Sequence, residues 1–98
     1  MMITDPFVFK VLDISTAHMS KEDSQKLQAE ADNGHAPVYE LRDYGFLVYV
    51  GEIEENWPDD EMSSAFRKVL DSAKELGCDY VRFDRDGREY AELEKFNW

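Results

Sequence analysis

The pattern of apolar and polar positions predicts strands and helices in the order β-α-β-β-α-β. Five short segments rich in β-branched and aromatic residues are expected as strands: 7–14, 38–42, 46–50, 80–84 and, as an extra C-terminal strand, 88–93. The first has apolar residues on both alternating faces, which is typical of a central strand. Asp43-Tyr44-Gly45 is expected as the hairpin turn between the second strand and the third.

A first helix is expected to run to about Asp32. Ser20 is a favoured N-cap residue, and Asp23 stands in the position of a capping-box acid. Asn33-Gly34 provides a favourable left-handed exit at the other end. The apolar face of this segment is thin, consisting mainly of Leu27 and an alanine, so we expect the helix to pack weakly.

A second helix is the clearest element of the chain. Apolar residues recur at i, i+4, i+7, i+8, i+11 and i+14 along one stripe: Met62, Phe66, Val69, Leu70, Ala73 and Leu76. Asp59 or Asp60 is expected as the N-cap of this helix, since aspartate accepts hydrogen bonds from the first free N–H groups. Gly77 is expected to end it.

These elements predict a single α+β domain of residues 1–98 with two layers. The order is that of the ferredoxin-like split βαβ arrangement, an antiparallel sheet with two helices on one face. Strand alternation is expected to turn two sets of side chains to opposite faces of the sheet. The set facing the helices is Tyr39, Leu41, Val81 and Phe83, and the set on the open face is Val38, Glu40, Arg42, Tyr80 and Arg82.

The charge is the most unusual property of the chain, with 22 acidic against 11 basic residues and a formal net charge of −11. Six acids and no lysine or arginine fall between residues 52 and 61, here called the acidic run: Glu52, Glu54, Glu55, Asp59, Asp60 and Glu61. The first helix adds a possible second acidic patch: Glu22, Asp23, Glu30 and Asp32. Like charge destabilises a compact chain through self-repulsion. The acidic run is therefore either a solvated loop that serves solubility or a surface that binds a positive partner.

Composition excludes several other function classes. The chain is 43% hydrophobic, which favours a folded domain over a disordered acidic tail. The acid surplus disfavours direct binding to nucleic acid or to an anionic membrane. The longest apolar stretches, such as 46–50, are too short to span a bilayer, and the N-terminal segment lacks the features of a signal peptide. The single cysteine, Cys78, excludes an internal disulfide and predicts a cytoplasmic protein. We expect a monomer or a weak dimer.

Candidate catalytic and metal-binding residues are few. His18, His35 and Cys78 are the only soft or borderline metal ligands, and none lies at metal-site spacing from another, so no metal or cofactor is expected. The segment 84–87, Asp-Arg-Asp-Gly, resembles the start of a phosphoryl-transfer site, but Arg88 stands where that motif has a threonine. An aspartate turn is the favoured interpretation there, and a loop or capping role is favoured for His18 over activation of a nucleophile.

Trp57 lies inside the acidic run, and two interpretations of it are open. The indole can staple the loop to the core, or it can be an exposed anchor, since tryptophan is enriched among binding hot spots. An acidic rim around such an anchor suits a basic protein groove. Alternate side chains along a strand repeat every ~6.6 Å, which is of the order of the spacing between backbone phosphates, so a folded acidic protein can imitate nucleic acid.

Three blocks of sequence carry a resemblance to known proteins. They are Ile14-Ser15-Thr16-Ala17-His18, Tyr44-Gly45-Phe46-Leu47-Val48-Tyr49-Val50 and Gly77-Cys78-Asp79-Tyr80-Val81-Arg82-Phe83-Asp84-Arg85-Asp86-Gly87. Together they resemble small uncharacterised proteins of bacterial plasmids, prophages and phages. In size, charge and expected fold the chain is more loosely similar to the small acidic anti-CRISPR and antirestriction proteins of phages, several of which are DNA mimics. This similarity implies no catalytic residues.

The leading hypothesis is a non-enzymatic inhibitor, encoded by a phage or mobile element, of a nucleic-acid-binding defence complex of the host. Its most concrete form is an anti-CRISPR that blocks target-DNA recognition by a Cas subunit, so the expected partner is a basic nucleic-acid-binding protein such as a CRISPR effector subunit. The alternative is a regulatory or assembly module that binds another copy or an acidic protein through the open sheet face. An enzyme that uses His18 or Asp84 is the third and least favoured hypothesis.

Overall fold

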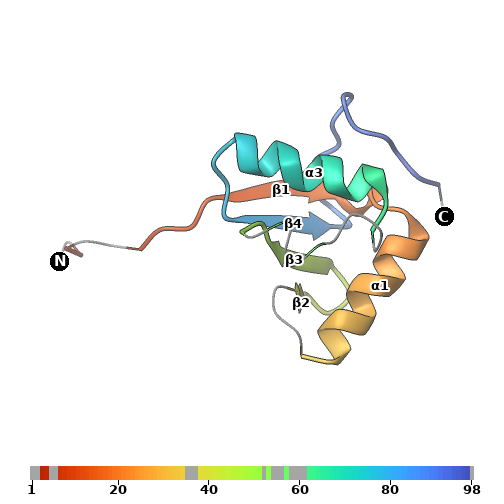
Figure 1. The fold of residues 1–98 in the computed structure, drawn as a ribbon, viewed down its shortest axis with the longest axis horizontal. Helices are drawn as coiled ribbons and strands as arrows, with labels where there is room; N and C mark the ends of the chain where they lie inside the picture. Colours follow the sequence, from red (N-terminus) through yellow and green to blue (C-terminus); the bar gives the residue numbers. More distant parts are fainter. Residues whose placement is uncertain are drawn as a thin grey trace.

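The computed structural model describes residues 3–4, 7–34, 38–51, 53, 57 and 62–97. Its elements are β1 (Val11–Ser15), the 3-10 helix η1 (Thr16–His18), α1 (Lys21–Asp32), β2 (Val38–Glu40), β3 (Gly45–Tyr49), α3 (Ser64–Glu75) and β4 (Tyr80–Asp84). Figure 1 shows α3 lying across the sheet, α1 beside its β2 end, and the N-terminal segment projecting from the body. The predicted α+β class and the order of strands and helices are confirmed.

The four-stranded sheet has the order β1-β4-β3-β2. The pairs β2–β3 and β3–β4 are antiparallel, whereas β1 pairs with β4 in parallel, so the sheet is mixed rather than wholly antiparallel. The first strand lies at an edge and not in the centre, and it begins at Val11 instead of residue 7. Of its apolar residues, only Leu12 and Ile14 pack toward the core. The apolar residues on the other face of this strand therefore do not mean that it is central.

The register of β2 reverses the predicted faces of that strand. Val38 pairs with Val48, and both are buried beneath the helices, whereas Tyr39 is 51% exposed on the open face. Glu40 accepts a hydrogen bond of 3.1 Å from the Gln28 amide of α1, so it also lies on the helix side. The side-chain period of a strand is two, and a shift by one residue therefore exchanges its faces completely.

The other predicted sheet faces are wrong just after β2 and correct in β4. Strand β2 ends at Glu40, and Arg42 lies in the turn with a φ of 53°, so neither it nor Leu41 is a strand residue. In β4 the prediction is confirmed, because Val81 and Phe83 are buried and Arg82 is exposed on the other face. The open face of the sheet therefore has Tyr39, Leu47, Arg82 and Asp13 side by side across the four strands.

Helix α1 has the predicted boundaries, because its capping signals are local. The Asp23 N–H donates to Ser20 Oγ at 3.1 Å, and the helix leads into Gly34, which has a φ of 70° that glycine adopts without strain. The Asp23 carboxylate does not complete a capping box. It is 1% exposed and accepts hydrogen bonds from the Ser63 N–H, at 3.1 Å, and from the Ser63 hydroxyl.

Ser63, and not Asp59 or Asp60, is the N-cap of α3, since its hydroxyl accepts from the Phe66 N–H at 3.2 Å. The carboxylate of Asp23 thus lies at the N-terminal ends of both helices, where the helix dipoles favour negative charge. Along α3 the predicted apolar stripe is confirmed over four buried residues: Phe66, Val69, Leu70 and Ala73. No helix in the described ranges is long and apolar enough to cross a membrane.

The C-terminal segment, residues 88–97, contains no strand and packs along β1 and η1 instead. The Ser15 N–H donates to the Arg88 carbonyl at 2.8 Å, and the Phe96 N–H donates to the Ala17 carbonyl at 2.7 Å. These are isolated hydrogen bonds rather than a ladder. The predicted extra strand over 88–93 is therefore wrong: Tyr90 and Leu93 pack against the core without extending the sheet.

The link between Asp23 and Ser63 predicts a specific loss of stability. Replacing Asp23 with alanine removes a buried acceptor and leaves the Ser63 N–H unsatisfied, which costs about 1–3 kcal/mol of the free energy of unfolding. Urea unfolding followed by circular dichroism measures this loss. The matched control is Glu22→Ala, one residue away and exposed, for which a change within about 0.5 kcal/mol is expected. Equal effects of the two changes would show that the link is not important for folding.

Candidate functional site

The acidic run is attached to the core at both of its described positions. Glu52, Glu54, Glu55, Asp59, Asp60 and Glu61 lie outside the described residues, whereas Ile53 and Trp57 are described. Both of these apolar side chains are buried in the main core. The Trp57 N–H donates to the Ile53 carbonyl at 2.8 Å, the i to i+4 spacing of one helical turn. The acidic run is therefore anchored in the core at these two residues.

Trp57 is a core residue in this structure and not an exposed anchor. Its side chain is 3% exposed, and its ring packs edge-on against Phe66 with centroids 5.2 Å apart. The Arg67 guanidinium donates to the Trp57 carbonyl, while the indole Nε1 is buried without a hydrogen-bond partner. Of the two interpretations, the structure thus supports the staple. Burial of a large aromatic surface outweighs the cost of the unpaired indole N–H, and this burial leaves almost none of the ring available to a partner.

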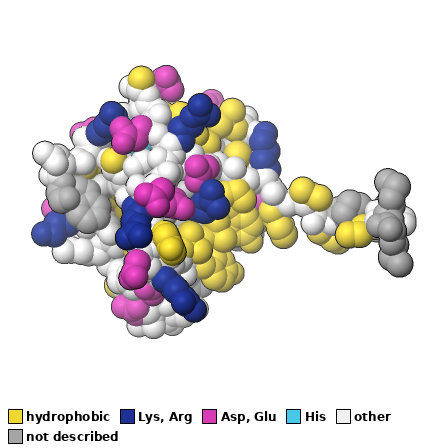
Figure 2. All heavy atoms as spheres, turned by 180° about the vertical axis from the view of Figure 1, so that it is seen from behind, with side chains coloured by type: hydrophobic (Ala, Val, Ile, Leu, Met, Phe, Trp, Pro, Cys, Tyr) yellow, Lys and Arg dark blue, Asp and Glu magenta, His cyan; other side chains and the backbone are white. Residues whose placement is uncertain are grey.

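The net charge of the protein is concentrated in the acidic run. All 11 lysines and arginines lie in the described residues, together with 15 of the 22 acids, so this part of the chain has a formal charge of only −4. The other seven acids are Asp5 and the six of the run. Figure 2 shows lysine and arginine side chains interspersed with acids over one face of the body. A ten-residue segment therefore accounts for more than half of the excess.

The second predicted patch is smaller than the sequence indicated. Glu22 and Asp32 are exposed on α1 and Glu30 is half-buried, but Asp23 is buried against Ser63 and is removed from any contact surface. The physical reason is that Asp23 serves as a shared acceptor for two helix ends. The same helix also exposes two lysines that offset its acids: Lys21 and Lys26.

A cavity of about 360 Å³ joins α1 to the acidic run. It is lined by Lys26, Ala29, Glu30, Trp57 and Met62. Glu30 of the second patch and Trp57 of the run therefore lie on the same side of the molecule. Trp57 is thus the described point at which the acidic run meets α1.

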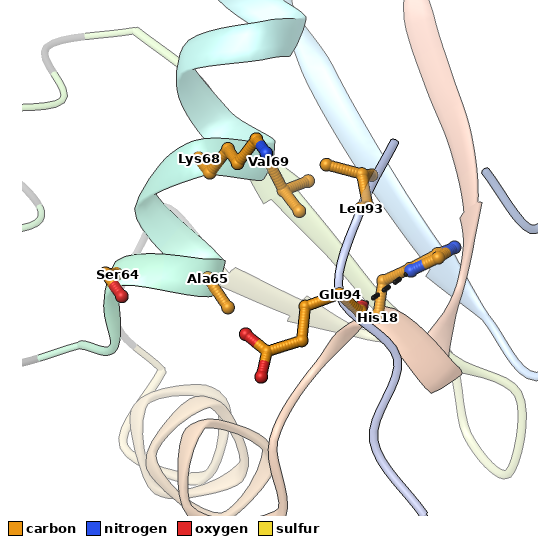
Figure 3. Close-up of a pocket in the computed structure, with 7 residues that line it drawn as sticks. All are labelled: His18, Ser64, Ala65, Lys68, Val69, Leu93 and Glu94. Atoms are coloured by element: carbon orange, nitrogen blue, oxygen red, sulfur yellow. Dashed lines mark hydrogen bonds between the residues drawn. The ribbon is translucent and has the colours of Figure 1, made fainter. Parts of the chain in front are cut away.

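The buried His18 lies beside a cavity of about 200 Å³ between α3 and the C-terminal segment (Figure 3). The lining residues are His18, Ser64, Ala65, Lys68, Val69, Leu93 and Glu94. The Tyr90 N–H donates to His18 Nε2 at 2.9 Å, so Nε2 is unprotonated, and Nδ1 therefore donates to the Glu94 carbonyl at 2.8 Å. Both nitrogens of the imidazole are occupied by the main chain. The ring ties the C-terminal segment to η1, as expected of a loop residue.

The segment 84–87 is a local aspartate turn. The Asp86 N–H donates to Asp84 Oδ1 at 2.8 Å, and the Gly87 N–H donates to the Asp84 carbonyl at 2.8 Å. The predicted turn is therefore confirmed, and the Asp84 carboxylate is engaged by the backbone of its own loop. Within the described ranges, no group of three or more histidine, cysteine, aspartate or glutamate side chains is placed to hold a metal ion.

An aromatic row on the open sheet face was not predicted. The Phe9 and Tyr80 rings meet edge-on with centroids 5.5 Å apart, and Tyr80 and Tyr49 lie at the same centroid distance. The sequence correctly placed Tyr80 on this face. It missed Phe9 because residues 7–14 were interpreted as a central strand, although their alternation is the signal that places Phe9 beside Tyr80. It missed Tyr49 because no faces were assigned to the strand over 46–50.

The two hydrogen bonds of His18 predict a local effect of removing its ring. His18→Ala frees the Tyr90 N–H and the Glu94 carbonyl, so amide hydrogen exchange at Tyr90 is expected to accelerate, with a loss of about 1–3 kcal/mol in the free energy of unfolding. The control is Glu94→Ala, because His18 bonds only the main chain of that residue. An unchanged exchange rate at the Tyr90 amide in the His18 variant would contradict the hydrogen bond between Tyr90 and His18.

Glu89 has a pKa below its ordinary range, because Lys95 hydrogen-bonds to its carboxylate at 2.8 Å and adds a favourable charge. Lys95→Met is expected to raise the pKa of Glu89 toward the ordinary value, as measured by NMR titration. Because the folded pKa is lowered, the pair stabilises the fold above the ordinary glutamate pKa and loses this effect as pH falls through the folded value. An unmoved titration would show that the pair is absent in solution.

Comparison with known proteins places the chain in a family. No curated protein and no solved structure matches it. A family model described as the C-terminal domain of a family of unknown function (DUF5983) matches residues 11–98. The match begins at the first residue of β1 and includes α1, α3, the four described strands and the C-terminal segment, while residues 1–10 precede it. The chain therefore belongs to this family of unknown function, DUF5983, and its residues 11–98 match the C-terminal domain of the family.

Proposed function

We propose that this domain is a non-enzymatic binding protein whose acidic run binds a positively charged protein surface in place of nucleic acid. One observation carries the proposal: six acids and no base lie within residues 52–61, whereas every lysine and arginine lies in the rest of the chain, where the acids are largely balanced. A solubility device needs only net charge. A binding surface needs its charge in one place.

The attachment of the run to the core supports binding. Ile53 and Trp57 are buried, and Ser63, just beyond the run, is held by Asp23. A segment fixed at these points loses less conformational freedom on binding than a free acidic tail does. Concentrated charge of one sign also steers a partner of opposite sign into contact and raises the association rate.

The partner that fits this charge is a basic protein that normally binds nucleic acid. The most concrete form of the proposal is an inhibitor, encoded by a phage or mobile element, that acts inside a bacterial cell on a CRISPR effector and blocks target-DNA recognition by a Cas subunit. The engagement of both His18 nitrogens and of the Asp84 carboxylate by the main chain supports a role without catalysis. The two acids exposed on α1, Glu22 and Asp32, extend the surface that such a partner meets.

Neutralising the acidic run tests the proposal. The variant replaces Glu52, Glu54, Glu55 and Glu61 with glutamine and Asp59 and Asp60 with asparagine. Its affinity for a purified CRISPR effector complex, measured by biolayer interferometry, is expected to fall at least about tenfold, because several charge contacts are lost together.

The matched control removes the same charge elsewhere. Six exposed acids are replaced by the corresponding amides: Asp43, Asp71, Glu75, Asp86, Glu92 and Glu94. This control is expected to keep its affinity within about threefold, because its acids lie among the lysines and arginines of the body. An equal loss in both variants would indicate a general charge effect and would contradict a role specific to the run.

A further inference from the structure

The residues before β1 form an extended apolar arm. We define the arm as residues 7–10, which lead into β1 at the N-terminal end of the sheet (Figure 1). The exposed fractions of Phe7, Val8 and Phe9 are 94%, 79% and 59%. Figure 2 shows hydrophobic side chains gathered on the open sheet face beside the base of the arm. Contiguous exposed apolar surface of this kind marks an interaction site.

The backbone of the arm continues the outer edge of the sheet. The Lys10 carbonyl accepts hydrogen bonds from the Asp79 and Tyr80 N–H groups, so the main chain of Lys10 faces β4. Because successive residues of a strand turn their backbone groups to opposite sides, those of Phe9 and Val11 face outward. An exposed edge of this kind is a template for pairing with another strand.

The other half of the β1 edge is already covered. The Ser15 N–H donates to the Arg88 carbonyl, and the Tyr90 hydroxyl donates to the Asp13 carbonyl, each at 2.8 Å. The C-terminal segment therefore occupies the edge from Asp13 onward. The part that remains exposed is the arm together with Val11.

Charge indicates which partner fits this edge. Residues 7–12 contain no acid and one lysine, although the chain as a whole has a formal charge of −11. More than half of the excess negative charge lies in the acidic run, so the repulsion between two copies is weak where both present this acid-free segment. A basic partner is attracted to the acidic run instead. An antiparallel pair of identical strands makes each of its contacts twice, which is the self-complementary geometry of a two-fold dimer.

We infer that two copies of this chain pair antiparallel through their arms, with Phe9 on the two-fold axis. Phe9 then lies opposite Phe9 of the second copy, and Phe7 lies opposite Val11 of the second copy. The backbone groups that face outward, at Phe9 and Val11, become the hydrogen-bonded positions of this pair. The aromatic row of Phe9, Tyr80 and Tyr49 continues across the axis into its counterpart. The interface uses a surface other than the acidic run and goes beyond the proposed function.

Sedimentation velocity over a range of protein concentrations tests the dimer. The full chain is expected to show a reversible monomer–dimer equilibrium, and Phe9→Glu is expected to raise its dissociation constant by about tenfold or more. The control is Tyr39→Glu, which introduces the same charge at an exposed aromatic residue on the open face but away from the arm. A monomeric wild-type chain, or an equal effect of the two variants, would overturn the inference. Binding through the acidic run is expected to be unchanged in Phe9→Glu.

Disulfide cross-linking tests the register independently of these variants. In a Cys78→Ser background, Phe9→Cys places two thiols opposite each other with Cα atoms about 5.5 Å apart, within the range that a disulfide bridges. Oxidation is expected to give a covalent dimer. Phe7→Cys faces Val11 of the second copy and is expected to cross-link at least about tenfold more slowly. Equal rates at the two positions would indicate random collision and would contradict the pairing.

Discussion

The buried carboxylate of Asp23 joins the beginnings of α1 and α3. It lies in α1 and accepts two hydrogen bonds from Ser63, the N-cap residue of α3. A negative charge at this position is favoured by the positive ends of both helices. Ser63 closely follows the acidic run in the sequence, so the same contact also fixes the chain just beyond the run. The burial of Trp57 against Phe66, in the first turn of α3, depends on that placement.

Local signals predicted the helices well and long-range contacts decided the rest. The boundaries of α1 follow from Ser20 and Gly34, whose effects act within a few residues. The cap of α3 does not, because several acceptors precede the helix and only the tertiary contact with Asp23 selects Ser63. In β2, Val38 and Tyr39 are both suited to a buried position, and pairing with Val48 determines which of them faces the core.

The candidate site could also be predicted only in part, because its charge is visible in the sequence but its long-range contacts are not. The acidic run is a property of the sequence and needed no fold to be found. The loss of Asp23 from the second patch could not be foreseen, because its partner lies 40 residues further along the chain. The staple role of Trp57 was one of two open interpretations, and contact with Phe66 decides between them. Both α1 and α3 pack with Trp57 on the buried side of the sheet, and the aromatic row lies on the open face, so the two proposed surfaces can be tested separately.

Competition with DNA addresses the central proposal most directly. A purified CRISPR effector complex is titrated with this protein in the presence of increasing amounts of target duplex, and the fraction of bound protein is measured. If the acidic run occupies the DNA-binding surface, the duplex displaces the protein completely, and the apparent affinity weakens steeply as salt is raised. Simultaneous binding of both ligands to one complex, with an affinity that is insensitive to salt, would contradict the account.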